Sequence, residues 1–220
     1  MPNNALHKLG QVSLNRDLHH PYTIIEPGAR IGDGVTSGPC CHMGSNVRLD
    51  DNDTLVSHGS LAGKLTFGPG VKVYPVAVMG HPPHALKIKD EDSETMVGDN
   101  TVIRKYVTIQ PGTKGRHMIT KVGKNCLLTA SCHVAHVCIV GDNVTLANNA
   151  TLAGHDAMGD NVIVDCLAAA HQHVRIGECA VICDMAGIAR DVIPLGMVIV
   201  DGSCLSGLNM VGLKRRGLGK

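Results

Sequence analysis

The sequence predicts an all-β protein whose short parallel strands wind into one long rod, and two observations lead to this prediction. First, an apolar residue recurs every six positions through about 25 hexads between Ile25 and Ile188, with Ser37 as the one polar residue in the series. Second, the next residue is glycine in ten of these hexads, and the fifth residue is usually small or β-branched. Such a period describes a short strand followed by a tight corner.

The period holds in three stretches. The apolar positions run from Ile25 to Met79, continue in phase from Val97 to Ile109, and resume one residue out of phase from Val122 to Ile188. Three hexads close one triangular coil of 18 residues, and stacked coils are spaced like hydrogen-bonded strands, at about 4.8 Å. We therefore expect about eight coils in a rod roughly 40 Å tall.

Two insertions interrupt the period, at residues 81–96 and 110–121, and both are rich in Pro, Gly, Lys and His. We expect them to be loops expelled from the rod, which is where solenoid proteins place function. Residues 1–18 are expected to be an N-terminal extension and residues 19–200 the rod. Residues 201–220 are expected to be a C-terminal segment that fits the start of a truncated helical domain.

Composition and charge restrict the class of function. Lys and Arg number 20 and Asp and Glu 19, so a net charge of +1 gives no reason to expect nucleic-acid binding. No window approaches the ~18 consecutive apolar residues of a membrane helix, and the N-terminus lacks the apolar core of a secretory signal. Nine cysteines without a C-x-x-C pair favour reduced thiols. We expect a cytoplasmic protein without membrane insertion.

Histidines gather in the second half of the chain, where five of the 13 lie between His133 and His173. Because residues 18 apart stack in one column, His155 should lie directly beside His173. His136 should lie in the neighbouring column with Gly154. An imidazole with a pKa near 6.5 in a partly buried cleft is a natural general base, so this cluster is the candidate for chemistry.

Five segments carry a resemblance to one enzyme family. They are IIEPGARIGDG (24–34), VTIQPGTKG (107–115), SCHVAHVCIVGDNVTLANNATLAGHDAMGDN (131–161), AAHQH (169–173) and NMVGLKRRG (209–217). They are collinear over residues 19–217 and resemble the UDP-N-acetylglucosamine O-acyltransferases of lipid A biosynthesis. ANNATLAGH and GLKRRG are specific to that family, whereas the hexads alone fit many transferases. The resemblance implies a left-handed parallel β-helix.

The resemblance also implies a reaction. In that family an (R)-3-hydroxyacyl group moves from acyl carrier protein to the 3-hydroxyl of UDP-N-acetylglucosamine, without a cofactor or metal, in a homotrimer with sites between the rods. By position, His136 matches the general base and Gly154 the backbone N–H that stabilises the oxyanion. The positions that match substrate-binding residues are Lys87, His133, His155, His171, Gln172, Asn209 and Arg215.

Several departures from the family fall at functional positions. Val137 stands where the family has the aspartate that orients the catalytic histidine, and Ala85 where it has the aspartate that grips the sugar hydroxyls. Asp165 and Asp184 replace glycines at two corners, the second at the position that sets acyl length. His173 replaces the aromatic residue that follows His-Gln.

These departures leave two other hypotheses open. One is a catalytically silent trimeric scaffold, or nucleotide-sugar binder, descended from the enzyme. The other is a metal-dependent β-helix enzyme similar to the gamma-class carbonic anhydrases, because imidazole and thiolate suit zinc or iron. Those enzymes place two ligands five residues apart, whereas the pairs His133/His136 and His81/His84 are three apart.

Overall fold

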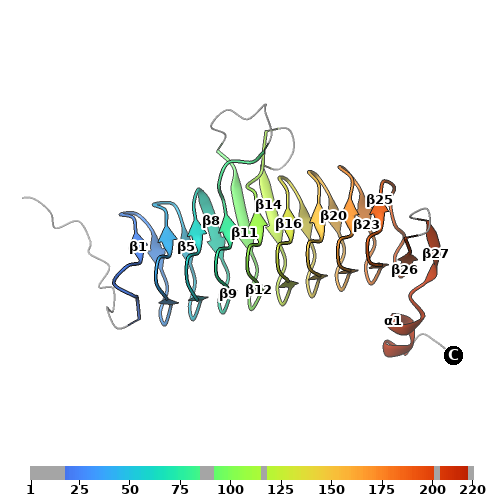
Figure 1. Ribbon diagram of the computed structural model, residues 1–220, viewed down its shortest axis with the longest axis horizontal. Helices are drawn as coiled ribbons and strands as arrows, with labels where there is room; N and C mark the ends of the chain where they lie inside the picture. Colours follow the sequence, from blue (N-terminus) through green and yellow to red (C-terminus); the bar gives the residue numbers. More distant parts are fainter. Residues whose placement is uncertain (1–17, 85–91, 115–117, 201–203, 218–220) are drawn as a thin grey trace, which may run out of the picture.

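The computed structural model describes residues 18–84, 92–114, 118–200 and 204–217, and these form a parallel β-helix that ends in a short helix (Figure 1). The chain coils along the length of the rod from the N-terminal end, blue in Figure 1, to the C-terminal end in red. Successive strands up to Ile188 fall in turn on three sheets, so each sheet takes every third strand, and the last two strands both join the third sheet. The rod expected from the hexads is confirmed.

The three sheets are defined by their strands. The first sheet holds β1 (Ile24–Ile25), β4 (His42–Met43), β7 (Ser60–Leu61), β10 (Val78–Met79), β13 (Thr108–Ile109), β16 (His133–Val134), β19 (Thr151–Leu152), β22 (Ala169–Ala170) and β25 (Gly187–Ile188). The second sheet holds β2 (Arg30–Ile31), β5 (Arg48–Leu49), β8 (Lys64–Phe67), β11 (Glu94–Val97), β14 (Ile119–Val122), β17 (Ile139–Val140), β20 (Ala157–Met158) and β23 (Arg175–Ile176). The third sheet holds β3 (Thr36–Ser37), β6 (Thr54–Leu55), β9 (Lys72–Val73), β12 (Val102–Ile103), β15 (Leu127–Leu128), β18 (Thr145–Leu146), β21 (Ile163–Val164), β24 (Val181–Ile182), β26 (Gly196–Val198) and β27 (Leu205–Leu208).

The hexad period fixes both the pairing and the core. Where no insertion intervenes, paired residues are 18 apart, as Ile24 and His42 are, except at the C-terminal end, where Val181 pairs with Met197, 16 residues later. The second residue of each two-residue strand points inward, so Leu146 and Leu152 are fully buried. Ser37, the polar exception, is also buried, and its hydroxyl donates a hydrogen bond to Thr23 Oγ1 at the N-terminal end of the rod.

Corners place a residue in the left-handed backbone region. Asparagine tolerates this conformation and occupies many corners: Asn52, Asn100, Asn125, Asn143, Asn149 and Asn161. Val137 has a φ of 60° at such a corner. Val76, with a φ of 64°, is the second valine at such a corner. A β-branched residue is strained there, so these two corners are less expected than those occupied by asparagine.

The two insertions leave the rod after β10 and after β13. β11 begins at Glu94 and β14 at Ile119, so the last three residues of each expected loop, 94–96 and 119–121, lie in strands. These four-residue strands turn one additional residue inward, because side chains alternate between the two faces of a strand. Thr95 pairs with Leu65 and Thr120, and both threonines are fully buried.

The C-terminal segment reverses the direction of the chain. β27 pairs antiparallel with β26 and is followed by α1 (Met210–Arg215). Asn209 caps α1, because its Oδ1 accepts the N–H of Gly212 at 2.9 Å. Its Nδ2 donates to the carbonyl of Cys179 at 2.9 Å, which ties the helix to the rod. No helix in the described part of the chain is long and apolar enough to cross a membrane.

Candidate active site

The histidine cluster lies where the first sheet turns into the second. His136 follows β16, His155 follows β19 and His173 follows β22, each at a corner that leads to a strand of the second sheet. The N–H of His155 donates to the carbonyl of His136 at 3.0 Å, and that of His173 donates to the carbonyl of Gly154 at 3.1 Å. These bonds stack the three corners directly on one another.

Their imidazole rings form a continuous contact. The His155 and His173 rings are stacked, with centroids 4.6 Å apart and planes 9° apart. The His136 ring meets His155 edge-on, with centroids 5.2 Å apart and planes 85° apart. The stacking of His155 on His173 and the closeness of His136, expected from the 18-residue coil, are both confirmed.

Gly154 makes room for the His136 ring. A Cβ at position 154 would lie 2.5 Å from Nε2 of His136 and 2.6 Å from its Cε1, so any side chain there would displace the ring. Partial burial lowers the pKa of His136, and the neighbouring charge of His173 lowers it further. A histidine that is neutral near neutral pH can accept a proton, as a general base must.

His133 extends the cluster onto the first sheet. It lies on β16 opposite Thr108 of β13, and its Nδ1 is 2.7 Å from the Thr108 hydroxyl. The His84 ring lies 6.2 Å away, in a tilted stack of 28°. Burial lowers the pKa of His133, and the charges of His84 and His136 lower it further. His133 and His136 therefore present two largely neutral imidazoles on adjacent surfaces.

The other expected site residues are less closely joined to the cluster. His171 and Gln172 are exposed at the same corner as His173. Asn209 is buried, and both ends of its amide already bond to the protein. Arg215 is exposed in the last turn of α1. Lys87 and the departure at Ala85 fall outside the described residues.

One charged residue near the cluster was missed by the sequence analysis. Asp156 follows His155 directly and is buried inside the rod, where its Oδ1 accepts the N–H of Val174 at 2.9 Å. Burial raises the pKa of Asp156 to about 7. A signal was available, because the residue occupies a fifth position that most hexads fill with a small or β-branched side chain.

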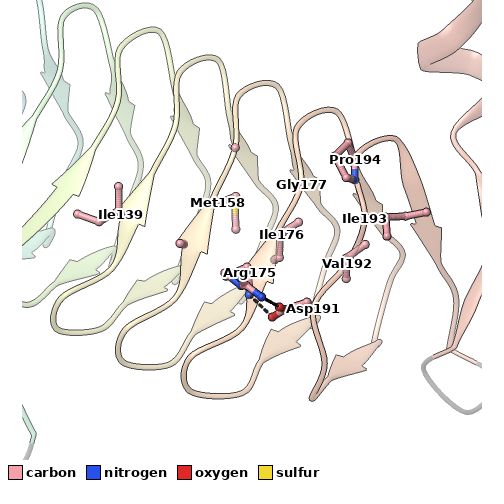
Figure 2. A pocket seen from close by; sticks show the side chains of 11 residues that line it. Ile139, Met158, Arg175, Ile176, Gly177, Asp191, Val192, Ile193 and Pro194 are labelled. Carbon is pink, nitrogen blue, oxygen red and sulfur yellow. Dashed lines mark hydrogen bonds and ion pairs between the residues drawn. The ribbon is translucent and has the colours of Figure 1, made fainter.

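An apolar pocket of about 460 Å³ lies on the second sheet beyond the same corners (Figure 2). Its lining includes Ile139, Met158 and Ile193. Figure 2 shows Arg175 reaching Asp191, whose Oδ2 accepts from the Arg175 Nε at 2.8 Å. The pocket and His133 therefore lie on two faces of the rod that meet at the histidine corners.

The described residues contain no group of three or more His, Cys, Asp and Glu that could hold a metal ion. One copy of the described chain therefore offers no three-ligand set by itself, whereas the metal-dependent hypothesis takes its histidine ligands from neighbouring subunits. The rings of His155 and His173 are stacked face to face, which is not how two histidines coordinate one metal ion.

The chain is similar to known acyltransferases over most of its length. A family model described as bacterial transferase hexapeptide (six repeats) matches residues 119–154. The acyl-[acyl-carrier-protein]–UDP-N-acetylglucosamine O-acyltransferase of Rhizobium johnstonii is 41% identical over 199 residues, which are 90% of this chain and 73% of the relative. The enzyme of the same name from Campylobacter concisus is 36% identical, over 90% of this chain and 76% of the relative.

Solved structures agree with these relatives. The UDP-N-acetylglucosamine O-acyltransferase of Moraxella catarrhalis matches with a TM-score of 0.89 and 33% identity, over 92% of this chain and 79% of that one. The Arabidopsis UDP-N-acetylglucosamine acyltransferase matches with a TM-score of 0.80 and 32% identity, over 91% and 77%. The expected left-handed parallel β-helix is thereby confirmed. Identity and coverage of this extent establish that the chain belongs to the family of the acyl-[acyl-carrier-protein]–UDP-N-acetylglucosamine O-acyltransferases.

Proposed function

We propose that the protein transfers an (R)-3-hydroxyacyl group from acyl carrier protein to the 3-hydroxyl of UDP-N-acetylglucosamine, with His136 as the general base. The family relationship supports the substrates, since the curated relatives carry both in their names. The observation that carries the assignment of the base is the His136 ring itself, which is partly buried, depressed in pKa and held against Gly154.

The reaction needs one proton to move twice. Neutral His136 takes the proton of the sugar 3-hydroxyl while that oxygen attacks the thioester carbonyl carbon. The backbone N–H of Gly154 donates to the oxyanion as negative charge develops on the carbonyl oxygen. The C–S bond then breaks, and protonated His136 returns the proton to the leaving thiolate. The close packing of His136 on Gly154 supports this division of roles, because it brings base and donor to one place.

Val137 changes how the base is held. The family's aspartate would accept a hydrogen bond from the histidine ring, whereas a valine side chain offers no acceptor. Val137 is buried, and its N–H donates to the Thr120 hydroxyl at 2.8 Å, so this corner is tied to the rod. His136 is accordingly oriented by packing against Gly154 and His155 rather than by a carboxylate.

The substrate contacts are proposals of the same kind. His133, His155, His171 and Gln172 line the corner region that would receive the sugar and nucleotide. Arg215 would bind the diphosphate, since a planar guanidinium binds it bidentately. Asn209 would act by holding α1 in place, because its amide is already used by Gly212 and Cys179. We assign Lys87 to the same substrate by its match to the family.

The test is direct transfer from 3-hydroxyacyl carrier protein to UDP-N-acetylglucosamine, followed by mass spectrometry of the nucleotide sugar. His136→Ala should lose about 10²–10⁴ in kcat, the usual contribution of a positioned base. His58→Ala, at an exposed corner of a different column, is the matched control and should retain parental kcat. Parental activity in His136→Ala would overturn the assignment.

A silent scaffold is the second candidate, and Val137 in place of the orienting carboxylate is the observation that favours it. Val137→Asp separates the two proposals, because a carboxylate beside the ring fixes its tautomer and supports its positive charge. An enzyme should gain activity in this variant. No turnover by the parent or by Val137→Asp, together with calorimetric binding of UDP-N-acetylglucosamine, would instead identify a nucleotide-sugar binder.

A further inference from the structure

The family match leaves His173 without a role, yet this residue completes the column of rings beside the proposed base. Val137, His155 and His173 occupy successive corners of one column, each with a positive φ. The first of these positions lacks the expected carboxylate and the last carries an imidazole where the family has an uncharged aromatic ring. Two departures therefore fall on the same column, two coils apart, around His136.

The contacts give His173 two routes of influence on His136. The first is mechanical, because the nearly parallel stack on His173 fixes the plane of the His155 ring, and the His136 ring packs edge-on against that same ring. The N–H of His173 also bonds to the carbonyl of Gly154, the residue on which His136 rests. The second is electrostatic, since the ring distances place His173 within about 10 Å of His136.

We propose that His173 is a positioning residue for the general base, which holds the His136 ring through the stacked ring of His155. This inference rests on the proposed role of His136 as base. The stacked ring at position 173 steadies His136 where the carboxylate is missing, as an uncharged aromatic ring at this position would also do. The imidazole adds a charge when it is protonated, and this charge disfavours the protonated form of His136, although it cannot stabilise the imidazolium as an aspartate would.

The surroundings of His136 leave few other groups to produce the same effect. The titratable side chains near it in the described residues are imidazoles, namely His155 and His173 at the corners and His133 on β16, with His84 beyond. Besides these imidazoles, Asp156 follows His155 directly and is buried inside the rod against the N–H of Val174. Cys138, two residues after His136, is also buried, and burial raises the pKa of its thiol to about 12. Because burial raises the pKa of Asp156 to about 7, the acidic limb of the rate profile overlaps the titration of this carboxyl. The NMR titration of the His136 ring is therefore the decisive readout.

Two variants at one position separate the two effects. His173→Phe keeps a ring to stack on His155 and removes the charge, whereas His173→Ala removes both. His58→Phe is the control, since His58 has a positive φ at an exposed corner of another column. The readouts are the titration of His136 by NMR of its ring protons, which needs no turnover, and the pH profiles of kcat and KM.

His173→Phe should raise the pKa of His136 by about 0.3 unit, the size of one charge at 10 Å in a solvated site, and move the acidic limb of kcat upward by the same amount. At pH 8 its kcat should equal that of the parent. His173→Ala should show the same shift and also lose about tenfold in kcat at pH 8 with KM nearly unchanged, because the His136 ring is no longer held.

Several results would overturn the proposal. One is a His136 titration that neither variant moves. Another is a loss in His173→Ala confined to KM, which would make His173 a substrate contact. A third is an equal shift in His58→Phe. If the parent shows no turnover while His173→Phe still shifts the His136 titration, the proposed function fails and the coupling between the rings stands.

Discussion

Two aspartates inside the rod make its stability depend on pH. Asp53 and Asp156 are almost fully buried, and each accepts the N–H of the residue 18 positions later, Val71 at 2.7 Å and Val174 at 2.9 Å. The second oxygen of Asp53 accepts the N–H of Asp50 at 3.0 Å. The second oxygen of Asp156 is buried without a hydrogen-bond partner in the described part of the chain. The two sites therefore differ in how well an amide could replace the carboxyl.

The magnitude follows from the pKa values. Burial raises the pKa of both carboxyls from 3.8 to about 7 in the folded protein. Below pH 3.8 both states hold the proton and the full stability is present. As the pH rises toward 7 the unfolded chain releases the proton first, so the free energy of unfolding falls by about 1.4 kcal/mol per pH unit for each carboxyl. Above pH 7 the accumulated loss is on the order of 4 kcal/mol per site.

Asp156→Asn is the sharper probe of this loss. An asparagine keeps an oxygen for the Val174 N–H and places its amide group where the carboxyl oxygen has no partner. Urea unfolding at fixed protein concentration should show the free-energy difference between variant and parent growing in favour of the variant by about 2–3 kcal/mol from pH 5 to pH 8. Comparing variant with parent cancels the histidines, which titrate in both. A difference that does not change with pH would refute the reasoning.

Asp53→Asn provides the comparison within the same chain. One of its two backbone donors, the N–H of Val71 or that of Asp50, would lose its acceptor. Its free energy of unfolding should therefore be lower than that of Asp156→Asn at every pH, by about 1–3 kcal/mol. The dependence of the variant–parent difference on pH should be similar in the two variants, because both remove a carboxyl with the same folded pKa.

Four further outcomes are expected. Leu146→Ala should lower the free energy of unfolding by about 2–5 kcal/mol in urea titrations, and Leu146→Asp should yield no cooperatively folding protein. Gly154→Ala should displace the His136 ring and lower kcat about a hundredfold in the transfer assay, with a urea midpoint near the parental one. Asn209→Ala should speed amide hydrogen exchange in α1, because the helix loses its cap. Sedimentation should give a trimer of the 23.1-kDa chain, and a monomer or a stable dimer would contradict the expected placement of sites between the rods.

The sequence predicted the rod because one period controls strand, corner and core at the same time. Apolar residues six apart set the inward positions, and 18 residues per coil set the pairing without further information. The hexad period did not predict the first residues of the four-residue strands β11 and β14. Thr95 and Thr120 occupy inward positions with polar side chains, so β11 and β14 resembled the ends of loops. Burial of a threonine depends on its hydrogen bonds, which a hydrophobic period does not reveal.

The same arithmetic explains which parts of the site could be predicted. The relation of His136 to Gly154 and His155 is fixed by coil stacking, so the sequence sufficed to place these residues together. The hexad period ends at Ile188, and Asn209 lies beyond it, after β27 has reversed the direction of the chain by pairing antiparallel with β26. Its position depends on one antiparallel pairing and on a bond to Cys179 that no repeat encodes.

The buried polar side chains show what limits a rule based on side-chain size. At ordinary corners the N–H of the fifth residue of a hexad donates to the carbonyl three residues earlier in the same corner, as the N–H of Ala150 donates to the Ala147 carbonyl at 3.0 Å. At some corners this hydrogen bond is longer, as between the N–H of Val174 and the His171 carbonyl at 3.4 Å. A weakly held N–H can be shared with a side chain from the coil before. Thr101 accepts the N–H of Cys126 in this way, as Asp53 and Asp156 accept those of Val71 and Val174. The fifth position therefore selects for small volume or for one inward acceptor, and the second option is what brings a carboxyl next in sequence to His155.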